Sequence, residues 1–245
     1  MKPCMHDVRP VDAHTPTPQV VVTGMYPSSA YPSQLSSIPS HWSSVSDGSP
    51  ATHESSTWPA SQYVALDSVR AVNLPIEAGF DVGACAGIPI MTAHRCVHAD
   101  GPTAGQTILV TGGAGRVGYY AIQWAKMAGA KVIASASNAR DEAVCREAGA
   151  KHVFNHREPG WGERVKALNG GKPVDRVIDV EFGANLPEVL DCIRTSGIIA
   201  TYSSTQVKEP QLPFLRIMYL DLTIHFVIVY SMPEVAKKHA IADIT

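Results

Sequence analysis

Residues 111–118 read Thr111-Gly112-Gly113-Ala114-Gly115-Arg116-Val117-Gly118, a stretch that contains the spacing G-x-G-x-x-G. An apolar run precedes it and a segment of helical periodicity follows it. Gly113 permits a tight strand-to-helix turn, Gly115 leaves room for a ligand beside the backbone, and Gly118 lets the helix approach the strand. Because the first N–H groups of a helix attract anions, the pattern is typical of a pyrophosphate-binding turn. A tight turn without a ligand is the alternative.

Around this turn, short apolar runs alternate with helical segments from about residue 105 onward. Strands are predicted at 107–111, 131–135, 152–154, 174–179, 197–202 and 222–229, and helices at 116–128, 139–148, 161–168, 185–194 and 233–243. Continuous apolar strands separated by helices indicate a parallel sheet that is covered on both faces. Six strands in this order predict an α/β fold with a doubly wound parallel sheet, the Rossmann dinucleotide-binding fold.

The composition changes along the chain and predicts three parts. Residues 1–62 hold half of the 18 prolines, and 18 of the 36 residues in 27–62 are Ser or Pro, so we expect a largely disordered leader. A short strand at Val20–Val22 is the exception. Residues 63–103 look folded but irregular, with glycines spaced among small apolar residues. Residues 104–245 form the predicted dinucleotide-binding domain.

Charge and cysteine content restrict the class of protein. The net charge is -2 over 245 residues, so no overall excess of charge points to nucleic acid or to an anionic membrane. No apolar run approaches the roughly 20 residues of a membrane helix, and the start has no apolar core of a secretory signal. The five cysteines are scattered, without a C-x-x-C pair. Reduced thiols in a cytoplasmic protein are therefore expected, without disulfides or a structural zinc site.

The end of the second predicted strand bears on the choice of cofactor. Sites that prefer NAD place Asp or Glu there, which binds the ribose 2′-hydroxyl. Residues 134–140 contain no acid, whereas Ser137, Asn138 and Arg140 supply a hydroxyl, an amide and a guanidinium. Such groups suit a 2′-phosphate, which favours NADP. Asn138 as a plain helix cap is the alternative, and Asp141 would partly offset the charge of Arg140.

Two families of dinucleotide-binding enzymes have this glycine pattern. Extended short-chain dehydrogenases need a Tyr-x-x-x-Lys pair, and no tyrosine of this chain has Lys four residues later. They also carry the motif near the N-terminus, whereas more than a hundred residues precede it here. The short-chain interpretation is therefore rejected.

The other family fits, because the sequence of motifs resembles the medium-chain dehydrogenase/reductases. The nearest branch is that of the zinc-independent, zeta-crystallin-like quinone oxidoreductases. The matching stretches are 87–94 (Gly-Ile-Pro-Ile-Met-Thr-Ala-His), the glycine turn, 148–157, 177–183 and 196–202. The resemblance covers about residues 62–245.

The resemblance implies a set of residues that bind NADPH. They are Thr92, Gly113, Gly115, Arg116, Val117, Gly118, Ser137, Asn138, Arg140, His156, Ser203, Phe226 and Val227. The glycine turn would hold the pyrophosphate, Ser137 to Arg140 would face the 2′-phosphate, and Thr92 would lie near the nicotinamide. Two positions depart from the family pattern: Asp141 replaces a lysine used by some members, and His156 replaces a tyrosine.

The resemblance also implies an activity and a partner. Family members transfer a hydride from NADPH to a quinone or a similar electron-poor carbonyl or alkene, and the last strand pairs two subunits. We therefore expect a homodimer formed through residues 222–230, and a small quinone-like electron acceptor as the other partner. No residue is predicted as general acid or base, because the cofactor carries the chemistry.

Two expectations concern what the sequence lacks relative to the family. His53-Glu54 lacks the preceding glycine of the zinc-bearing relatives, and no cysteine cluster is present, so no metal is predicted. Relative to the family, we also expect most of the N-terminal catalytic domain and the end of the last helix to be missing. A catalytically inactive dinucleotide-binding module, or a truncated pseudoenzyme, is therefore the alternative function.

Overall fold

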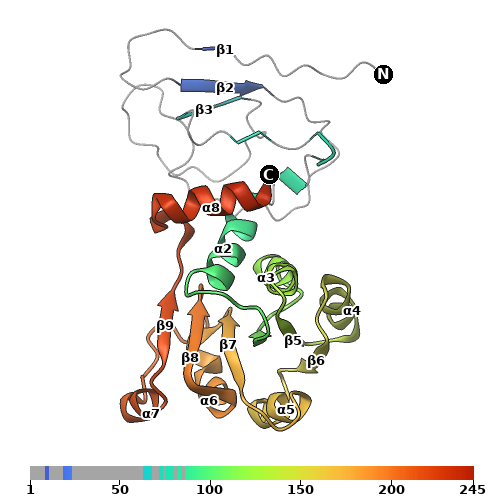
Figure 1. The fold of residues 1–245 in the computed structure, drawn as a ribbon, viewed down its shortest axis with the longest axis vertical. Helices are drawn as coiled ribbons and strands as arrows, with labels where there is room; N and C mark the ends of the chain where they lie inside the picture. The colour runs from blue at the N-terminus through green and yellow to red at the C-terminus, as the bar shows by residue number, and fades with distance from the viewer. Residues whose placement is uncertain are drawn as a thin grey trace. The chain divides into compact units, whose positions relative to one another are not determined.

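The computed structural model describes residues 9–10, 19–23, 63–67, 72–73, 76–79, 82–83 and 86–245. The chain divides into two compact units, 1–73 and 74–245. In the first unit, β1 (Arg9–Pro10), β2 (Gln19–Thr23) and β3 (Tyr63–Asp67) form an antiparallel sheet in the order β1-β2-β3 (Figure 1). β2 confirms the strand predicted at Val20–Val22. Within 1–62 the structure describes β1 and β2, and the disorder predicted for the other residues of that range falls outside the described ones.

The second unit is built on a six-stranded parallel sheet in the order β6-β5-β4-β7-β8-β9. Its strands are β4 (Thr107–Val110), β5 (Lys131–Ala136), β6 (His152–Asn155), β7 (Val174–Asp179), β8 (Ile193–Thr201) and β9 (Thr223–Phe226). The chain first winds from β4 outward to β6, then returns to the other side of β4 and continues to β9. This is the doubly wound Rossmann topology, as predicted.

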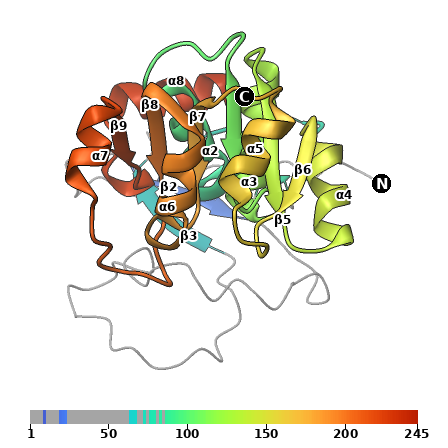
Figure 2. The same ribbon diagram turned by 90° about the horizontal axis from the view of Figure 1, so that it is seen from below.

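Helices lie on both sides of this sheet (Figures 1 and 2). They are α2 (Ile88–His98), α3 (Arg116–Met127), α4 (Ala139–Ala148), α5 (Trp161–Leu168), α6 (Phe182–Cys192), α7 (Phe214–Tyr219) and α8 (Glu234–Ile244). A 3-10 turn, η3 (Val229–Ser231), precedes α8. In this unit α8 contacts α2, where His94 Nε2 lies 2.7 Å from Asp243 Oδ2.

Each face of the sheet has its own hydrophobic core, because successive residues of a strand point to opposite faces. Along β4, Ile108 and Val110 contribute to the core beneath α2, α3 and α4. Leu109, between them, contributes to the other core, beneath α5 and α6. All three side chains are fully buried, which is why the strand reads as a continuous apolar run rather than an alternating one.

Capping residues explain why the predicted helix 139–148 is confirmed at both ends. Asn138 is the N-cap of α4, and its side-chain oxygen accepts a hydrogen bond from the backbone N–H of Asp141 at 2.9 Å. Gly149 ends the helix in the left-handed conformation, with φ of 117°.

Four predictions need correction, and one helix was not predicted. The last strand was expected over 222–229, but β9 ends at Phe226 and η3 follows, so the edge is short. α6 begins three residues before the predicted 185, and β8 starts at Ile193. The segment expected to be irregular contains the regular helix α2, which packs on α3. α7 was not predicted at all, because six residues are too few to show a helical period.

Candidate functional site

The glycine turn lies where the winding of the sheet reverses. β4 and β7 are neighbours in the sheet, and the chain leaves their carboxyl ends in different directions. Ligands of doubly wound sheets bind in the crevice outside such a point. The residues that follow the two strands are joined there: Thr111 Oγ1 donates to Asp179 Oδ1 at 2.5 Å, and the N–H of Val180 donates to Thr111 Oγ1 at 2.9 Å.

The three motif glycines differ in what prevents a larger side chain. A Cβ on Gly113 would lie 2.7 Å from Cys145 Sγ, and a Cβ on Gly118 would overlap the carbonyl oxygen of Gly112. Both glycines are therefore required by the packing of the turn itself. Gly115 is exposed, and a Cβ there would have one close neighbour, the Gly112 oxygen at 3.1 Å. Packing within the turn therefore explains why residues 113 and 118 are glycines, but it gives a much weaker reason for a glycine at 115.

The start of α3 supplies hydrogen-bond donors beside Gly115. Gly115 is the N-cap residue, no side chain caps the helix, and its first turn carries no acidic residue. The first amides of a helix have no intrahelical acceptor, and the helix dipole adds a partial positive charge there. Val117 and Gly118 lie in this first turn, so the sequence prediction of an anion-binding turn has a matching geometry.

A buried carboxyl group lies directly behind this turn. Asp179 is fully buried, and its Oδ1 accepts hydrogen bonds from Thr111 and from Asn185 Nδ2, the latter at 2.8 Å. Burial raises the pKa of Asp179, and the hydrogen bonds only partly oppose that shift. Its Oδ2 has no hydrogen-bond partner among the described residues. The group thus holds β4 and β7 together at the crevice.

The end of β5 brings together the residues predicted for the adenosine side. Ser137 Oγ donates to Asp141 Oδ2 at 3.3 Å, and Asn138 Nδ2 donates to the same oxygen at 2.8 Å. His156 Nδ1 donates to the carbonyl of Ala136 at 3.1 Å, and Arg140 is exposed. Asn138 is therefore also a helix cap, which was the alternative interpretation. The structure places the carboxylate of Asp141, which the sequence had marked as offsetting Arg140, in direct contact with Ser137 and Asn138.

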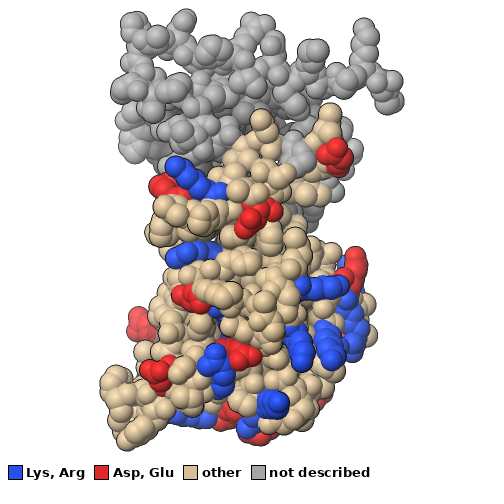
Figure 3. Space-filling model, viewed as in Figure 1, with Lys and Arg blue, Asp and Glu red and all other residues tan. Residues whose placement is uncertain are grey.

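The face of the molecule seen in Figure 3 shows the charges around this region. Lys and Arg side chains gather on the side where α4 lies, and acidic side chains stand close to them. The α4 segment itself carries such a mixture, including the ion pair of Arg146 with Glu142 at 2.7 Å. The surface around α4 thus carries charges of both signs.

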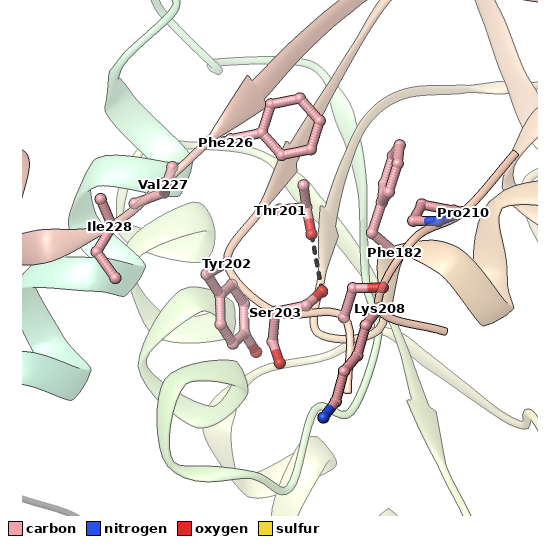
Figure 4. A pocket seen from close by; sticks show the side chains of 10 residues that line it. Phe182, Thr201, Tyr202, Ser203, Lys208, Pro210, Phe226, Val227 and Ile228 are labelled. Carbon is pink, nitrogen blue, oxygen red and sulfur yellow. Dashed lines mark hydrogen bonds between the residues drawn. The ribbon is translucent and has the colours of Figure 1, made fainter. Parts of the chain in front are cut away.

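A pocket of about 310 Å³ opens at the carboxyl ends of β8 and β9 (Figure 4). The predicted residues Ser203, Phe226 and Val227 all line it, together with Phe182, Tyr202 and Lys208. The rings of Phe182 and Phe226 meet edge to face, with centroids 5.4 Å apart. Thr92, which was predicted near the nicotinamide, is buried in α2 and does not line this pocket.

The segment 203–208 forms one wall of the pocket, and Glu181 holds it in place by hydrogen bonds. The Glu181 carboxylate accepts hydrogen bonds from Thr205 N at 2.8 Å, Thr205 Oγ1 at 2.7 Å and Gln206 N at 3.0 Å, with Val207 N at 3.4 Å. Burial by itself would raise the pKa of Glu181, but these hydrogen bonds outweigh it and lower the pKa. Glu181 and Lys208 were not predicted from the sequence, although an acid directly after an apolar strand is a usable signal.

Neither a metal site nor a membrane span is found in the part of the chain that the structure describes. No group of three or more His, Cys, Asp or Glu side chains within the described ranges is placed to hold a metal ion. No helix of the described part is long and apolar enough to span a bilayer. Cys96, Cys145 and Cys192 are free and buried, whereas Cys4 and Cys85 lie outside the described residues.

The fold and the glycine turn define the class: a Rossmann-type domain with the features of a dinucleotide site at its switch point. A family model described as "Zinc-binding dehydrogenase" matches residues 117–244. The chain therefore belongs to this family, within the medium-chain dehydrogenase/reductase superfamily, as the resemblance indicated.

Individual relatives agree with this assignment. The chain is 32% identical over 144 residues to a quinone oxidoreductase of Pongo abelii and 31% identical to one of Homo sapiens. Each alignment covers 58% of this chain and 44% of the relative, so the chain spans less than half the length of these curated relatives.

Solved structures share the fold. The structure of Escherichia coli quinone oxidoreductase complexed with NADPH superposes with a TM-score of 0.67 at 24% identity, over 75% of this chain and 57% of that one. A mycobacterial quinone oxidoreductase gives a TM-score of 0.67 at 25% identity, with the same coverage of both chains.

Proposed function

We propose that this chain binds NADPH across the switch point of its sheet and belongs to a zinc-independent reductase of quinones or similar electron-poor carbonyls and alkenes. The exposed Gly115 at the uncapped start of α3 carries the proposal, because a dinucleotide pyrophosphate would account for a glycine that packing explains poorly. Similarity to quinone oxidoreductases, including one solved with NADPH, supports the choice of cofactor and acceptor.

Each part of the cofactor would have its own set of residues. The turn from Gly113 to Gly118, with Arg116 and Val117, would hold the pyrophosphate. Ser137, Asn138, Arg140 and His156 would surround the adenosine ribose and its phosphate. Ser203, Phe226 and Val227 would line the nicotinamide end, and Thr92 would support it from α2. When bound, NADPH supplies the hydride, while the protein orients the cofactor and excludes water.

We also propose the three-part organisation expected from the sequence, with 1–62 as leader, 63–103 as a remnant of the catalytic domain and 104–245 as the cofactor domain. The buried free thiols favour a cytoplasmic location. The second candidate function is a non-catalytic dinucleotide-binding module, since the glycine turn and the pocket account for cofactor binding by themselves. NADPH oxidation at 340 nm with a quinone acceptor separates the two: turnover supports the reductase, and binding without turnover supports the module.

Asp141 offers a test of the adenosine side. A carboxylate beside a bound 2′-phosphate repels it, so Asp141→Asn is expected to tighten NADPH binding about three- to tenfold and leave NADH within twofold. Fluorescence titration with both cofactors measures this. Glu142→Gln is the matched control, because it removes the same charge from a side chain that bonds Arg146 instead. Equal effects of both variants on NADPH would contradict the assignment.

The edge of the sheet at β9 supports the proposed homodimer. β9 is the last strand of the sheet order, and exposed apolar side chains surround it, including Phe214, Tyr219, Phe226 and Ile228 with exposed fractions of 69%, 77%, 64% and 55%. The strand is short, so the proposal rests on these exposed apolar side chains, which a second subunit would cover.

Phe214→Glu is expected to weaken the dimer about a hundredfold or more, because it places a charge in an apolar interface. Light scattering at micromolar protein should give twice 26.2 kDa for the wild type and the single mass for the variant. Met127→Glu, at an equally exposed apolar residue of α3, serves as control and should remain dimeric. A monomeric wild type would contradict the proposal.

A further inference from the structure

The segment 203–208 forms a wall of the pocket without belonging to a helix or strand. Ser203, Ser204 and Lys208 line the pocket, and the segment lies between the end of β8 and the start of α7. Figure 4 shows the side chains of Ser203 and Lys208 on the side of the pocket opposite Phe226. One backbone hydrogen bond, from the N–H of Phe182 to the carbonyl of Ser203 at 3.0 Å, holds the start of the segment. The residues that follow Ser203 are held by side chains that reach them.

Glu181 is the main group that reaches it. Its exposed fraction is 7%, and the donors of three successive residues converge on its two oxygens: Thr205, Gln206 and Val207. A second link runs through Ser204, whose Oγ accepts from the N–H of Gly183 at 3.0 Å and donates to the carbonyl of Val207 at 2.5 Å. Both links start in the first residues at or before α6, so α6 and the pocket wall are fastened together.

The chemistry of this contact requires a carboxylate. All groups that face Glu181 in these bonds are N–H or O–H donors, and an ionised carboxylate only accepts hydrogen bonds. A glutamine would turn one N–H2 group toward backbone N–H groups, leaving donors opposed to donors. Glu181→Gln therefore breaks part of the contact while keeping the size of the side chain.

We propose that Glu181 is a positioning residue for the cofactor pocket, holding residues 203–208 in the conformation that receives the nicotinamide half of the dinucleotide. This inference rests on the proposed function for its ligand. The contact itself does not, because the hydrogen bonds form within the chain.

The same helix contains a matched control. Glu188 of α6 accepts hydrogen bonds from the backbone N–H groups of Gly160 and Gly162, both at 2.7 Å. It thus accepts hydrogen bonds from backbone N–H groups as Glu181 does, but at the start of α5, and Glu188 does not line the pocket. Glu181→Gln and Glu188→Gln remove comparable interactions at different places.

The first experiment measures hydrogen exchange of the full-length chain without ligand. The amides of Thr205, Gln206 and Val207 should exchange at least tenfold faster in Glu181→Gln than in the wild type and in Glu188→Gln. Unchanged exchange at these amides in Glu181→Gln would overturn the inference. This result is independent of whether the chain binds any cofactor.

The second experiment titrates NADPH into the three proteins and records their thermal unfolding. Glu181→Gln should raise the Kd for NADPH about tenfold or more, whereas Glu188→Gln should change it less than threefold at a similar drop in Tm. Equal changes in Kd would overturn a positioning role and leave only a structural one. If the wild type fails to bind NADPH, the proposed function fails, and the exchange result alone decides whether Glu181 orders the wall.

Discussion

Gly115→Ala is expected to weaken NADPH binding roughly ten- to hundredfold while lowering the free energy of unfolding by less than about 1 kcal/mol. The backbone of Gly115 has φ of -72° and ψ of 164°, which alanine adopts without strain. Among the described residues, the new methyl group would meet only the carbonyl oxygen of Gly112, at 3.1 Å. On the ligand side it would stand where the pyrophosphate approaches the backbone.

Gly118→Ala is the matched comparison, since the same methyl group there meets the backbone of Gly112 and Gly113 from inside the turn. We expect this variant to lose about 2–3 kcal/mol of stability in urea denaturation, because backbone atoms must move. Of the two variants, Gly115→Ala alone is thus expected to weaken NADPH binding while keeping most of the free energy of unfolding. If Gly115→Ala binds NADPH as tightly as the wild type, the glycine turn is only a tight turn.

The second large effect is expected at a partly buried ion pair. Arg176 of β7 is fully buried, and its guanidinium lies 3.7 Å from the carboxylate of Asp100, donating also to the carbonyls of Cys96 and Asp100. Burial lowers the pKa of Arg176, and the nearby Asp100 opposes this shift. The Nδ1 of His225 in β9 lies 3.2 Å from the same carboxylate, so Asp100 connects two strands.

Asp100→Ala should therefore cost about 2–4 kcal/mol of stability, because it leaves a buried guanidinium without a counter-charge. Asp191→Ala, which removes the partner of the exposed Arg216, should cost less than about 1 kcal/mol. Arg176→Met replaces the buried charge by an apolar chain of similar length and should cost less than Asp100→Ala. Urea denaturation compares the three, and equal costs for both aspartates would contradict a stabilising role of the partly buried pair.

The parts of the fold that sequence predicted well carry local signals. The strand at 107–111, the glycine turn and the helix that follows agree with β4 and α3 to within a residue or two. α4 was predicted at both ends, because Asn138 and Gly149 are capping residues in their usual places. In α2, Pro89 near the helix start was a signal of the same kind, which the surrounding glycines obscured.

The candidate site was predictable only in its backbone features. Ser203, Phe226 and Val227 line one pocket. That this pocket receives the cofactor, as the family resemblance implies, stays a prediction. The role of Glu181 depends on residues 24 to 26 positions further along the chain, which only the return of β8 beside β7 brings near. Similarly, the side chain of Asp141 contacts Ser137 because α4 begins between them. The residue types at the end of the strand do not predict that contact.

The most direct test is a fluorescence titration of the full-length chain with NADPH and, in parallel, with NADH. We predict saturable binding of NADPH with a Kd between about 1 μM and 1 mM, weaker binding of NADH, and loss of the NADPH signal in Gly115→Ala. The absence of saturable binding of either cofactor up to about 1 mM would contradict a dinucleotide site at the switch point of this sheet.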